Sequence, residues 1–260
     1  MILFDDIDYQ ESIWSRLEPV PFKQRDYTPT EIEHIFDRMN KYLREDYISK
    51  FGFKEDIKMI KQSNENFIVL SFLNKFLSGH NGFICGGCFK NIFSKEKIRD
   101  IDIFFENQSD YNEAVLKFNG DTEFTHFYSS KNVEAYKHKD TSIVIELCHT
   151  IYGTPECIIS QFDFTIVKFA YFKETTQDGT ETRTEYKVLY HENFFEHLLM
   201  KRLVIDNTIP FPINTFERTL KYIRYGFLPC YETKLKLLEA INKLPEEQIK
   251  TKETFYDGYD

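Results

Sequence analysis

The sequence predicts an α+β fold: a mixed sheet backed by helices, with a helical lead before it and a helical lobe after it. Short apolar runs with strand-like alternation lie between residues 83 and 190, whereas apolar residues at helical spacing predominate before and after them. The apolar fraction of 42% over 260 residues is enough for a sizeable core. We therefore expect a helical lead over 1–62, a core over 63–190, and a helical lobe with an acidic tail over 191–260.

Two helices are expected ahead of the first strand. Thr28 begins a capping box that ends at Glu31, with Pro at the first helical position, and helical spacing continues to Leu43. A second helix should run from about Asn64 to Ser78 and stop at Gly79. The apolar residues expected on its buried face are Phe67, Ile68, Phe72, Leu73, Phe76 and Leu77.

The middle of the chain reads as strands separated by short helices. A helix is expected over 109–118, and Thr154-Pro155-Glu156 opens another brief helical turn. Asp178-Gly179 predicts a hairpin within residues 173–190. The remaining predicted strands are Glu123–Ser129, Asn132–Lys137, Ser142–His149 and Phe162–Phe172.

Helical spacing returns from His191 onwards. Asn214 or Thr215 is the expected cap of one helix, which should end at Gly226, and Glu232–Leu244 is predicted as a final amphipathic helix. These segments should form the C-terminal lobe.

The segment from Phe83 to Phe105 carries the most informative chemistry. It begins with a short apolar run that ends in Gly86-Gly87 and later enters a strand pattern with Asp100 and Asp102. Side chains two apart on a strand point the same way, so both carboxylates should leave one face of the sheet. Two such oxygen ligands suit Mg²⁺, which is completed by water and substrate phosphates. Glycines at a strand end also let backbone N–H groups approach a polyphosphate.

Gly86-Gly87 followed by Asp100-Ile101-Asp102 resembles the signature of the nucleotidyltransferase superfamily typified by DNA polymerase β. This pattern of residues is most similar to that of the catalytic head of CCA-adding enzymes and poly(A) polymerases. The resemblance covers roughly residues 63–170, with a weaker similarity over 208–228. Lys90 stands where CCA-type heads usually carry Arg, and Asn91 stands where they carry Asp.

This resemblance implies transfer of a nucleoside monophosphate from an NTP to an acceptor hydroxyl, with release of pyrophosphate. Asp100, Asp102 and a third carboxylate would hold Mg²⁺ or Mn²⁺ in a two-metal scheme. The favoured acceptor is an RNA 3′ end, especially that of tRNA. A protein side chain comes next, and a small-molecule hydroxyl is third.

Two residues compete for the role of third carboxylate. Glu146 lies in a mostly apolar run typical of a central strand, and a buried carboxylate there needs a partner. Asp163 lies between two phenylalanines in a second apolar run, where Asp is the less expected residue. We favour Asp163 slightly, and either residue could instead be an ordinary paired acid.

Other residues are candidates for contact with the nucleotide. Gly86 and Gly87 would line the triphosphate through backbone N–H groups, and Lys90 would neutralise phosphate charge. Arg218, Tyr222 and Arg224 lie in the segment that resembles the helix after the head, where they could contact phosphate, base or ribose. The alternative for these last three is a solvated helix face.

Charge and hydropathy restrict the partners. The formal net charge of −9 disfavours non-specific binding to DNA or other nucleic acid, but a specific RNA or a local basic cleft stays compatible with it. No window approaches the roughly 20 apolar residues of a membrane span, and the first residues carry acids where a signal peptide needs bases. We therefore expect a cytoplasmic protein with no membrane partner.

The five cysteines allow two other interpretations. Cys85 and Cys88 form a CGGC motif that could act as a redox pair, but that would leave Asp100 and Asp102 unexplained. Zinc would need further ligands such as Cys148 and His149, yet adjacent residues on a strand face opposite ways.

Two functions from other classes remain open. A DxD glycosyltransferase would use the same two acids to hold a nucleotide-sugar through a metal, and the glycine pair would be incidental. A catalytically silent member of the superfamily would act as a binding or toxin-neutralising module.

Overall fold

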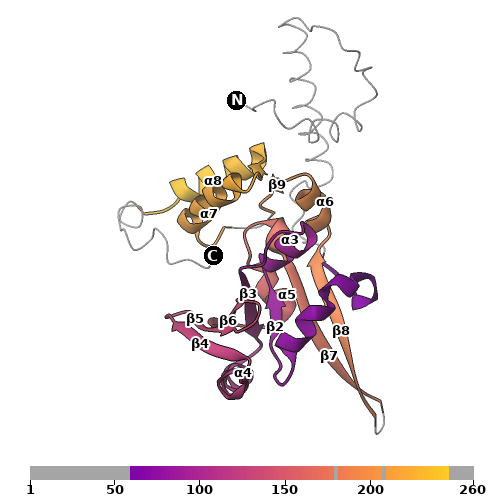
Figure 1. Cartoon of the computed structure of the whole chain (residues 1–260). Helices are drawn as coiled ribbons and strands as arrows, with labels where there is room; N and C mark the ends of the chain where they lie inside the picture. The colour runs from indigo at the N-terminus through magenta and orange to yellow at the C-terminus, as the bar shows by residue number, and fades with distance from the viewer. Residues whose placement is uncertain (1–58, 179–180, 207–208, 246–260) are drawn as a thin grey trace, which may run out of the picture. The chain divides into compact units, whose positions relative to one another are not determined.

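The computed structural model describes residues 59–178, 181–206 and 209–245 (Figure 1). The helix expected over residues 28–43 and the acidic tail lie outside the described residues. The strands are β1 (Met59–Ser63), β2 (Phe83–Cys85), β3 (Asp100–Phe105), β4 (Phe124–Ser129), β5 (Val133–His138), β6 (Val144–Tyr152), β7 (Phe169–Asp178), β8 (Glu181–His191), β9 (Arg202–Leu203) and β10 (Leu228–Pro229). The helices are η1 (Asn64–Leu77), α3 (Cys88–Phe93), α4 (Gln108–Gly120), α5 (Pro155–Ser160), η2 (Thr165–Val167), α6 (Phe194–Leu199), α7 (Pro212–Arg224) and α8 (Tyr231–Asn242).

One mixed sheet forms the centre of the fold, as the sequence predicts. Its strand order is β1-β8-β7-β2-β3-β6-β5-β4, in which β3 and β6 are parallel and every other neighbouring pair is antiparallel. The short strands β9 and β10 form a separate parallel pair. β1 starts at Met59, so the sheet recruits residues before the expected boundary at residue 63.

Two hydrophobic clusters cover the two faces of the sheet. The larger includes Ile101 and Ile103 of β3 and buried residues of η1, α3, α4 and α6. The smaller includes Phe104 of β3 together with Ile158 and Ile159 of α5. Because successive side chains of a strand leave opposite faces, β3 contributes to both clusters and its two aspartates share the face of the smaller one.

The expected second helix is present, but its geometry differs from the prediction. η1 is a 3₁₀ helix with a kink at Phe67, and its buried residues Phe67, Leu70, Leu73 and Phe76 recur every third position. A 3₁₀ helix stacks residues i and i+3 on one face. Ile68 and Phe72, which were expected to be buried, are 75% and 40% exposed.

The predicted strand Phe162–Phe172 is wrong in its first half. The chain forms η2 after Asp163, and β7 starts only at Phe169. The Asp163 carboxylate accepts a hydrogen bond from the Phe164 backbone N–H, 2.8 Å away, which favours a local turn over a strand ladder.

The capping prediction for α7 is also wrong. The helix begins at Pro212, two residues before the expected cap at Asn214, because proline suits the first helical position, where its missing N–H costs nothing. The predicted stop at Gly226 is confirmed by its φ of +82°, directly after the C-cap Tyr225.

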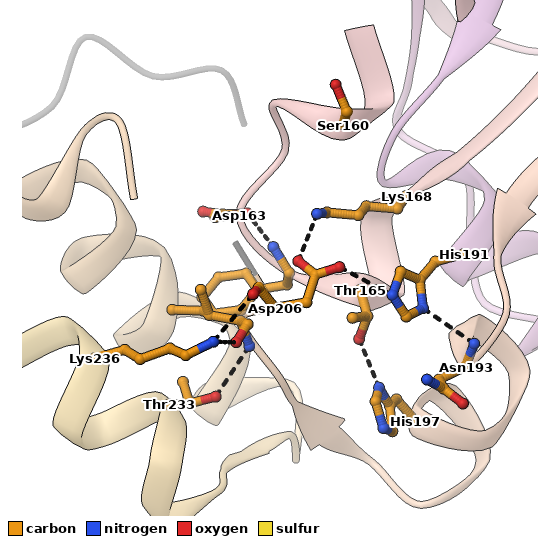
Figure 2. Close-up of polar contacts among 12 residues, drawn as sticks. Ser160, Asp163, Thr165, Lys168, His191, Asn193, His197, Asp206, Thr233 and Lys236 are labelled. Carbon is orange, nitrogen blue, oxygen red and sulfur yellow. Dashed lines mark hydrogen bonds and ion pairs between the residues drawn. The ribbon is translucent and has the colours of Figure 1, made fainter. Parts of the chain in front are cut away.

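A buried polar cluster joins the C-terminal helices to the sheet (Figure 2). The Lys168 ammonium, which is fully buried, lies 2.6 Å from Asp206 Oδ1, and His191 Nε2 lies 2.9 Å from Asp206 Oδ2. Lys236 of α8 donates to the backbone carbonyls of Ile205 and Asp206 at 2.8 and 3.1 Å. These contacts fix Ile205 and Asp206, which follow β9, against the sheet and α8.

Candidate active site

Asp100 and Asp102 lie on one face of β3, as predicted. Ile101 and Ile103, which alternate with them, are fully buried in the larger cluster on the opposite face. Asp102 is the register partner of Glu146 on the parallel strand β6. Since partners in a ladder share a face, the three carboxylates lie on neighbouring strands of the same face.

This arrangement concentrates negative charge. Burial, followed by the charges of Asp100 and Glu146, raises the pKa of the Asp102 carboxyl well above its usual value, although Arg218 and Lys221 act in the opposite direction. The Tyr128 hydroxyl of β4 donates a hydrogen bond to Glu146 Oε1. Burial and this bond raise the pKa of Tyr128.

The glycine pair forms an elbow beside these carboxylates. Gly86 has a φ of +97°, and a Cβ on it would lie 3.4 Å from Asp102 Oδ2. The predicted proximity of the elbow to the aspartates is therefore present. The Gly86 N–H, however, donates to the Phe169 carbonyl oxygen at 3.1 Å, so Gly86 contributes close approach of its backbone rather than this amide.

A cavity of about 210 Å³ opens between the elbow and α7. Gly86, Gly87 and Asp102 line it together with Arg218 and Tyr222 of α7. Tyr222 approaches the elbow, since a Cβ on Gly87 would lie 3.8 Å from its hydroxyl oxygen. The remaining lining residues are Phe104, Ile151, Ile158, Gln161, Phe162, Asp163, Val167, Pro210, Phe211, Asn214 and Thr215.

Asp163 lines the same cavity, where its carboxylate pairs with Arg218. Arg218 Nε lies 2.9 Å from Asp163 Oδ2, and its Nη2 lies 3.4 Å from Oδ1, so the pair is bidentate. Burial alone would lower the pKa of Arg218, but Asp163, with Tyr222 and Asp102, raises it overall. Glu146, rather than the favoured Asp163, is the carboxylate that the fold places opposite Asp102.

Two predicted nucleotide contacts lie outside the cavity lining. The Lys90 ammonium lies 3.2 Å from Glu96 Oε2, and burial lowers its pKa. It also faces the rings of Tyr225 and Phe227, with centroids 5.4 and 5.6 Å away. Arg224 lies on the exposed side of α7.

Several lining residues were not singled out from the sequence as site residues. Gln161, Asn214 and Thr215 bring polar groups to the cavity, and Phe211 is 66% exposed at its edge. The sequence predicts Asn214 and Thr215 only as helix caps and gives no signal of their position at the cavity. Tyr128 was missed because its contact with Glu146 depends on the strand order.

The cysteines and the wider donor set give no metal centre as the side chains stand. Within residues 59–178, 181–206 and 209–245, no group of three or more His, Cys, Asp and Glu side chains is placed to hold a metal ion. Cys85, Cys88 and Cys148 are buried as free cysteines, and burial raises the pKa of each thiol.

No helix among the described residues is both long and apolar enough to cross a bilayer.

The fold is similar to that of CCA-adding enzymes. The apo form I of a CCA-adding enzyme matches with a TM-score of 0.51 at 17% identity over 71% of this chain and 46% of that chain. A CCA-adding enzyme solved with ATP gives 0.51 at 18% identity over 71% and 47%, and one solved with CTP gives 0.50 at 18% identity over 71% and 46%. The chain thus matches less than half of the length of these neighbours, and the likeness shows a nucleotidyltransferase-like fold.

Comparison with curated proteins found no match. A family model described as "Gabija anti-defense 2 family protein" matches residues 63–201, which include the glycine elbow and the three carboxylates. Since this match extends over more than half of the chain, the protein belongs to the Gabija anti-defense 2 (Gad2) family.

Proposed function

We propose that this protein transfers a nucleoside monophosphate from an NTP to an acceptor hydroxyl. The observation that supports this most strongly is the position of Asp102 within van der Waals reach of the glycine elbow, on a cavity that Arg218 also lines. A DxD glycosyltransferase would use the two aspartates but gives the elbow no role. The fold, which is that of nucleotidyltransferases, favours the same proposal.

The carboxylate group has the chemistry of a Mg²⁺ or Mn²⁺ site. Asp100, Asp102 and Glu146 offer hard oxygen ligands from neighbouring strands, and their mutual repulsion is what a bound cation relieves. Asp100 and Asp102 would hold the ion together with water and substrate phosphates. Glu146, which is not placed with them as a three-residue site in the unliganded side-chain arrangement, would join them by turning toward the ion, in the role for which Asp163 was slightly favoured. A bound ion would neutralise phosphate charge and lower the pKa of the attacking hydroxyl.

The remaining residues bind and orient the nucleotide. Gly86 and Gly87 let the triphosphate approach the backbone, because a side chain at Gly86 would fill the space next to Asp102. Asp163 fixes the Arg218 guanidinium, which neutralises phosphate oxygens from the α7 side. Tyr222 and the polar groups of Gln161 and Asn214 contact the ribose or the base.

The reaction balances as a single displacement. The acceptor oxygen forms a bond to the α-phosphorus, and the bond from that phosphorus to the bridging oxygen of the β-phosphate breaks. Pyrophosphate leaves with the electron pair, and the hydroxyl proton passes to a nearby carboxylate or to water. The chain's contribution is to hold the reacting groups in line and to stabilise the charge.

For the acceptor, we propose an RNA 3′ end first and a protein side chain second. The test is incubation of the purified protein with each α-labelled NTP and a cell extract, followed by separation of RNA and protein. We expect Mg²⁺-dependent label in the RNA fraction. Label in protein would change the acceptor, and label in neither fraction with any NTP would contradict the proposed transfer.

The family description favours one second candidate. A protein that counters a defence could do so as a catalytically silent module that binds a component of that defence. Thermal unfolding separates the two functions, because a ligand that binds the folded state raises its stability. A silent module should show no Mg²⁺-dependent stabilisation by any NTP.

A further inference from the structure

The edge strand β4 presents two aromatic side chains to solvent. Phe127 is 53% exposed and Tyr128 is 37% exposed, and their ring centroids lie 5.4 Å apart in an edge-to-face arrangement. The register of β4 against β5 shifts between His126 and Tyr128, as in a β-bulge. Such an irregularity redirects side chains at the edge of a sheet. Exposed aromatic rings on an edge strand require an explanation beyond packing of the core.

The bulge places these rings on the face that carries the carboxylates. Tyr128 is the register partner of Ala135, which is the partner of Glu146, which in turn is the partner of Asp102. Register partners share a face, so one row of side chains runs across four strands from Tyr128 to the carboxylates of Glu146 and Asp102. The opposite face of this part of the sheet carries Tyr136, which packs against Phe118 of α4. α4 therefore packs on the opposite face and does not cover the face that carries the carboxylates (Figure 1).

A cation lies next to the exposed rings. Lys137 is two residues from Ala135 on β5 and so shares its face, and the Lys137 ammonium lies 5.4 Å from the centroid of the Phe127 ring. Thr125, the register partner of Lys137, is exposed beside it. The surface defined by Thr125, Phe127, Tyr128 and Lys137, here called the β4 platform, therefore combines two rings and a positive charge.

The β4 platform and the nucleotide cavity lie on opposite sides of the carboxylates. The strand order β2-β3-β6-β5-β4 puts the Gly86 elbow, which follows β2, on one side of Asp102 and puts Tyr128 on the other. The Tyr128 hydroxyl also touches Glu146 directly. When a donor nucleotide occupies the cavity, a second substrate can still reach the carboxylates from the side of the β4 platform.

We propose that the β4 platform binds the unpaired 3′-terminal nucleotides of a single-stranded RNA acceptor, with bases against Phe127 and Tyr128 and a phosphate near Lys137. This inference rests on the proposed nucleotidyl transfer and names its acceptor subsite. Base stacking on aromatic rings needs no defined sequence and is strong enough to position a strand end. Lys137 is the one charged side chain among the four residues of the platform, and Glu146 borders the platform through the hydrogen bond from Tyr128.

The test measures RNA binding separately from nucleotide binding. Fluorescence anisotropy would give the Kd of a labelled single-stranded RNA of roughly a dozen nucleotides, and of the same strand with its 3′ end paired in a hairpin. We expect tighter binding of the unpaired end and an increase in Kd of about tenfold in Phe127→Ala, as expected for one lost stacking contact. Tyr128→Phe, which keeps the ring, should retain RNA affinity, whereas Tyr128→Ala should lose it.

The control is Phe216→Ala, an aromatic truncation at a 40% exposed position of α7 outside the cavity lining, which should leave the Kd unchanged. Thermal stabilisation by Mg²⁺ and ATP should be the same in wild type and Phe127→Ala. Equal RNA affinity of wild type and Phe127→Ala would overturn the inference, as would a wild type that binds no RNA. So would a dimer that Phe127→Ala converts to a monomer, because a second copy would then cover the rings.

The two proposals fail in different ways. Absence of stabilisation by Mg²⁺ with every NTP removes the nucleotidyl transfer, whatever the RNA result. Normal stabilisation with label that enters protein, and no RNA binding, removes the β4 platform as an RNA subsite and retains the transfer.

Discussion

At the scale of single residues, Gly86 illustrates how one position links fold and function. Its φ of +97° lies in the region where a side chain is strained, and the Cβ of any replacement would lie 3.4 Å from Asp102 Oδ2. The glycine therefore permits the turn and also leaves space beside the carboxylate. Both requirements arise from the same missing atom.

Gly86→Ala should lower both stability and nucleotide binding. The left-handed backbone conformation costs about 1–2 kcal/mol for a residue with a Cβ, and the methyl group would obstruct the approach of a triphosphate. Urea unfolding measures the first effect, and the rise in Tm with Mg²⁺ and ATP measures the second. Gly120→Ala is the matched control, because nothing lies within 4 Å of a Cβ there. A Gly86→Ala protein that is stabilised by Mg²⁺ and ATP like wild type would contradict this role.

Residue pairs far apart in sequence limited what could be predicted of the site. The positions of Asp100 and Asp102 follow from alternation within one strand, so their shared face was predictable. The pairing of Asp163 with Arg218 joins residues that are 55 positions apart. Tyr128 reaches Glu146 because β5 pairs with both of their strands and brings the two residues into one row. Neither contact has a local sequence signal, so the sequence predicts neither the pairing of Asp163 with Arg218 nor the place of Tyr128 beside Glu146.

Among the elements, η1 shows why the ends of a helix can be predicted correctly while its predicted buried face is wrong. Its limits agree with the prediction within a residue, and its buried residues follow a period of three. The apolar positions of this segment satisfy both this period and the 3.6-residue period of an α-helix. Tertiary packing against Phe169 and Tyr190 selects among them, since Phe67 lies 6.0 and 5.9 Å from those ring centroids.

Two substitutions in η1 test this face directly. Leu73 is fully buried and Ile68 is 75% exposed. Leu73→Ala should reduce the free energy of unfolding by about 2–5 kcal/mol because it leaves a cavity, and Ile68→Ala should change it by at most about 0.5 kcal/mol. Chemical unfolding of both variants in parallel gives the comparison. Equal destabilisation by the two would mean that η1 buries a different face.

At the scale of the whole molecule, the cluster around Asp206 couples the C-terminal helices to the sheet. The Asn193 N–H donates to His191 Nδ1 at 3.0 Å, so neutral His191 carries its proton on Nε2, toward Asp206. Burial by itself raises the pKa of Asp206, but the bond to His191 and the charge of Lys168 outweigh it and lower the pKa to about 2. The carboxylate is thus stabilised in its charged form.

This shift predicts a pH-dependent contribution to stability. A folded-state pKa below the unfolded value stabilises the protein above the unfolded pKa, and this stabilisation is lost as the pH falls from about 4 toward 2. The contribution at neutral pH is about 2 kcal/mol. Unfolding measured from pH 5 to pH 2.5 should show this dependence in wild type and a weaker one in Asp206→Asn.

Asp206→Asn should also be less stable at neutral pH by about 3–5 kcal/mol, because buried Lys168 loses its counter-charge. Asp140→Asn, at an exposed turn, provides the control and should match wild type at every pH. An identical pH dependence in wild type and Asp206→Asn would show that this cluster does not carry the effect.

Transfer of label from an α-labelled NTP, measured side by side for wild type, Asp102→Ala and Asp140→Ala, tests whether Asp102 belongs to the reaction centre. If the carboxylates next to the glycine elbow form the reaction centre, Asp102→Ala abolishes transfer while its unfolding curve stays cooperative, and Asp140→Ala retains full transfer. Undiminished transfer by Asp102→Ala would show that this carboxylate is not part of the reaction centre.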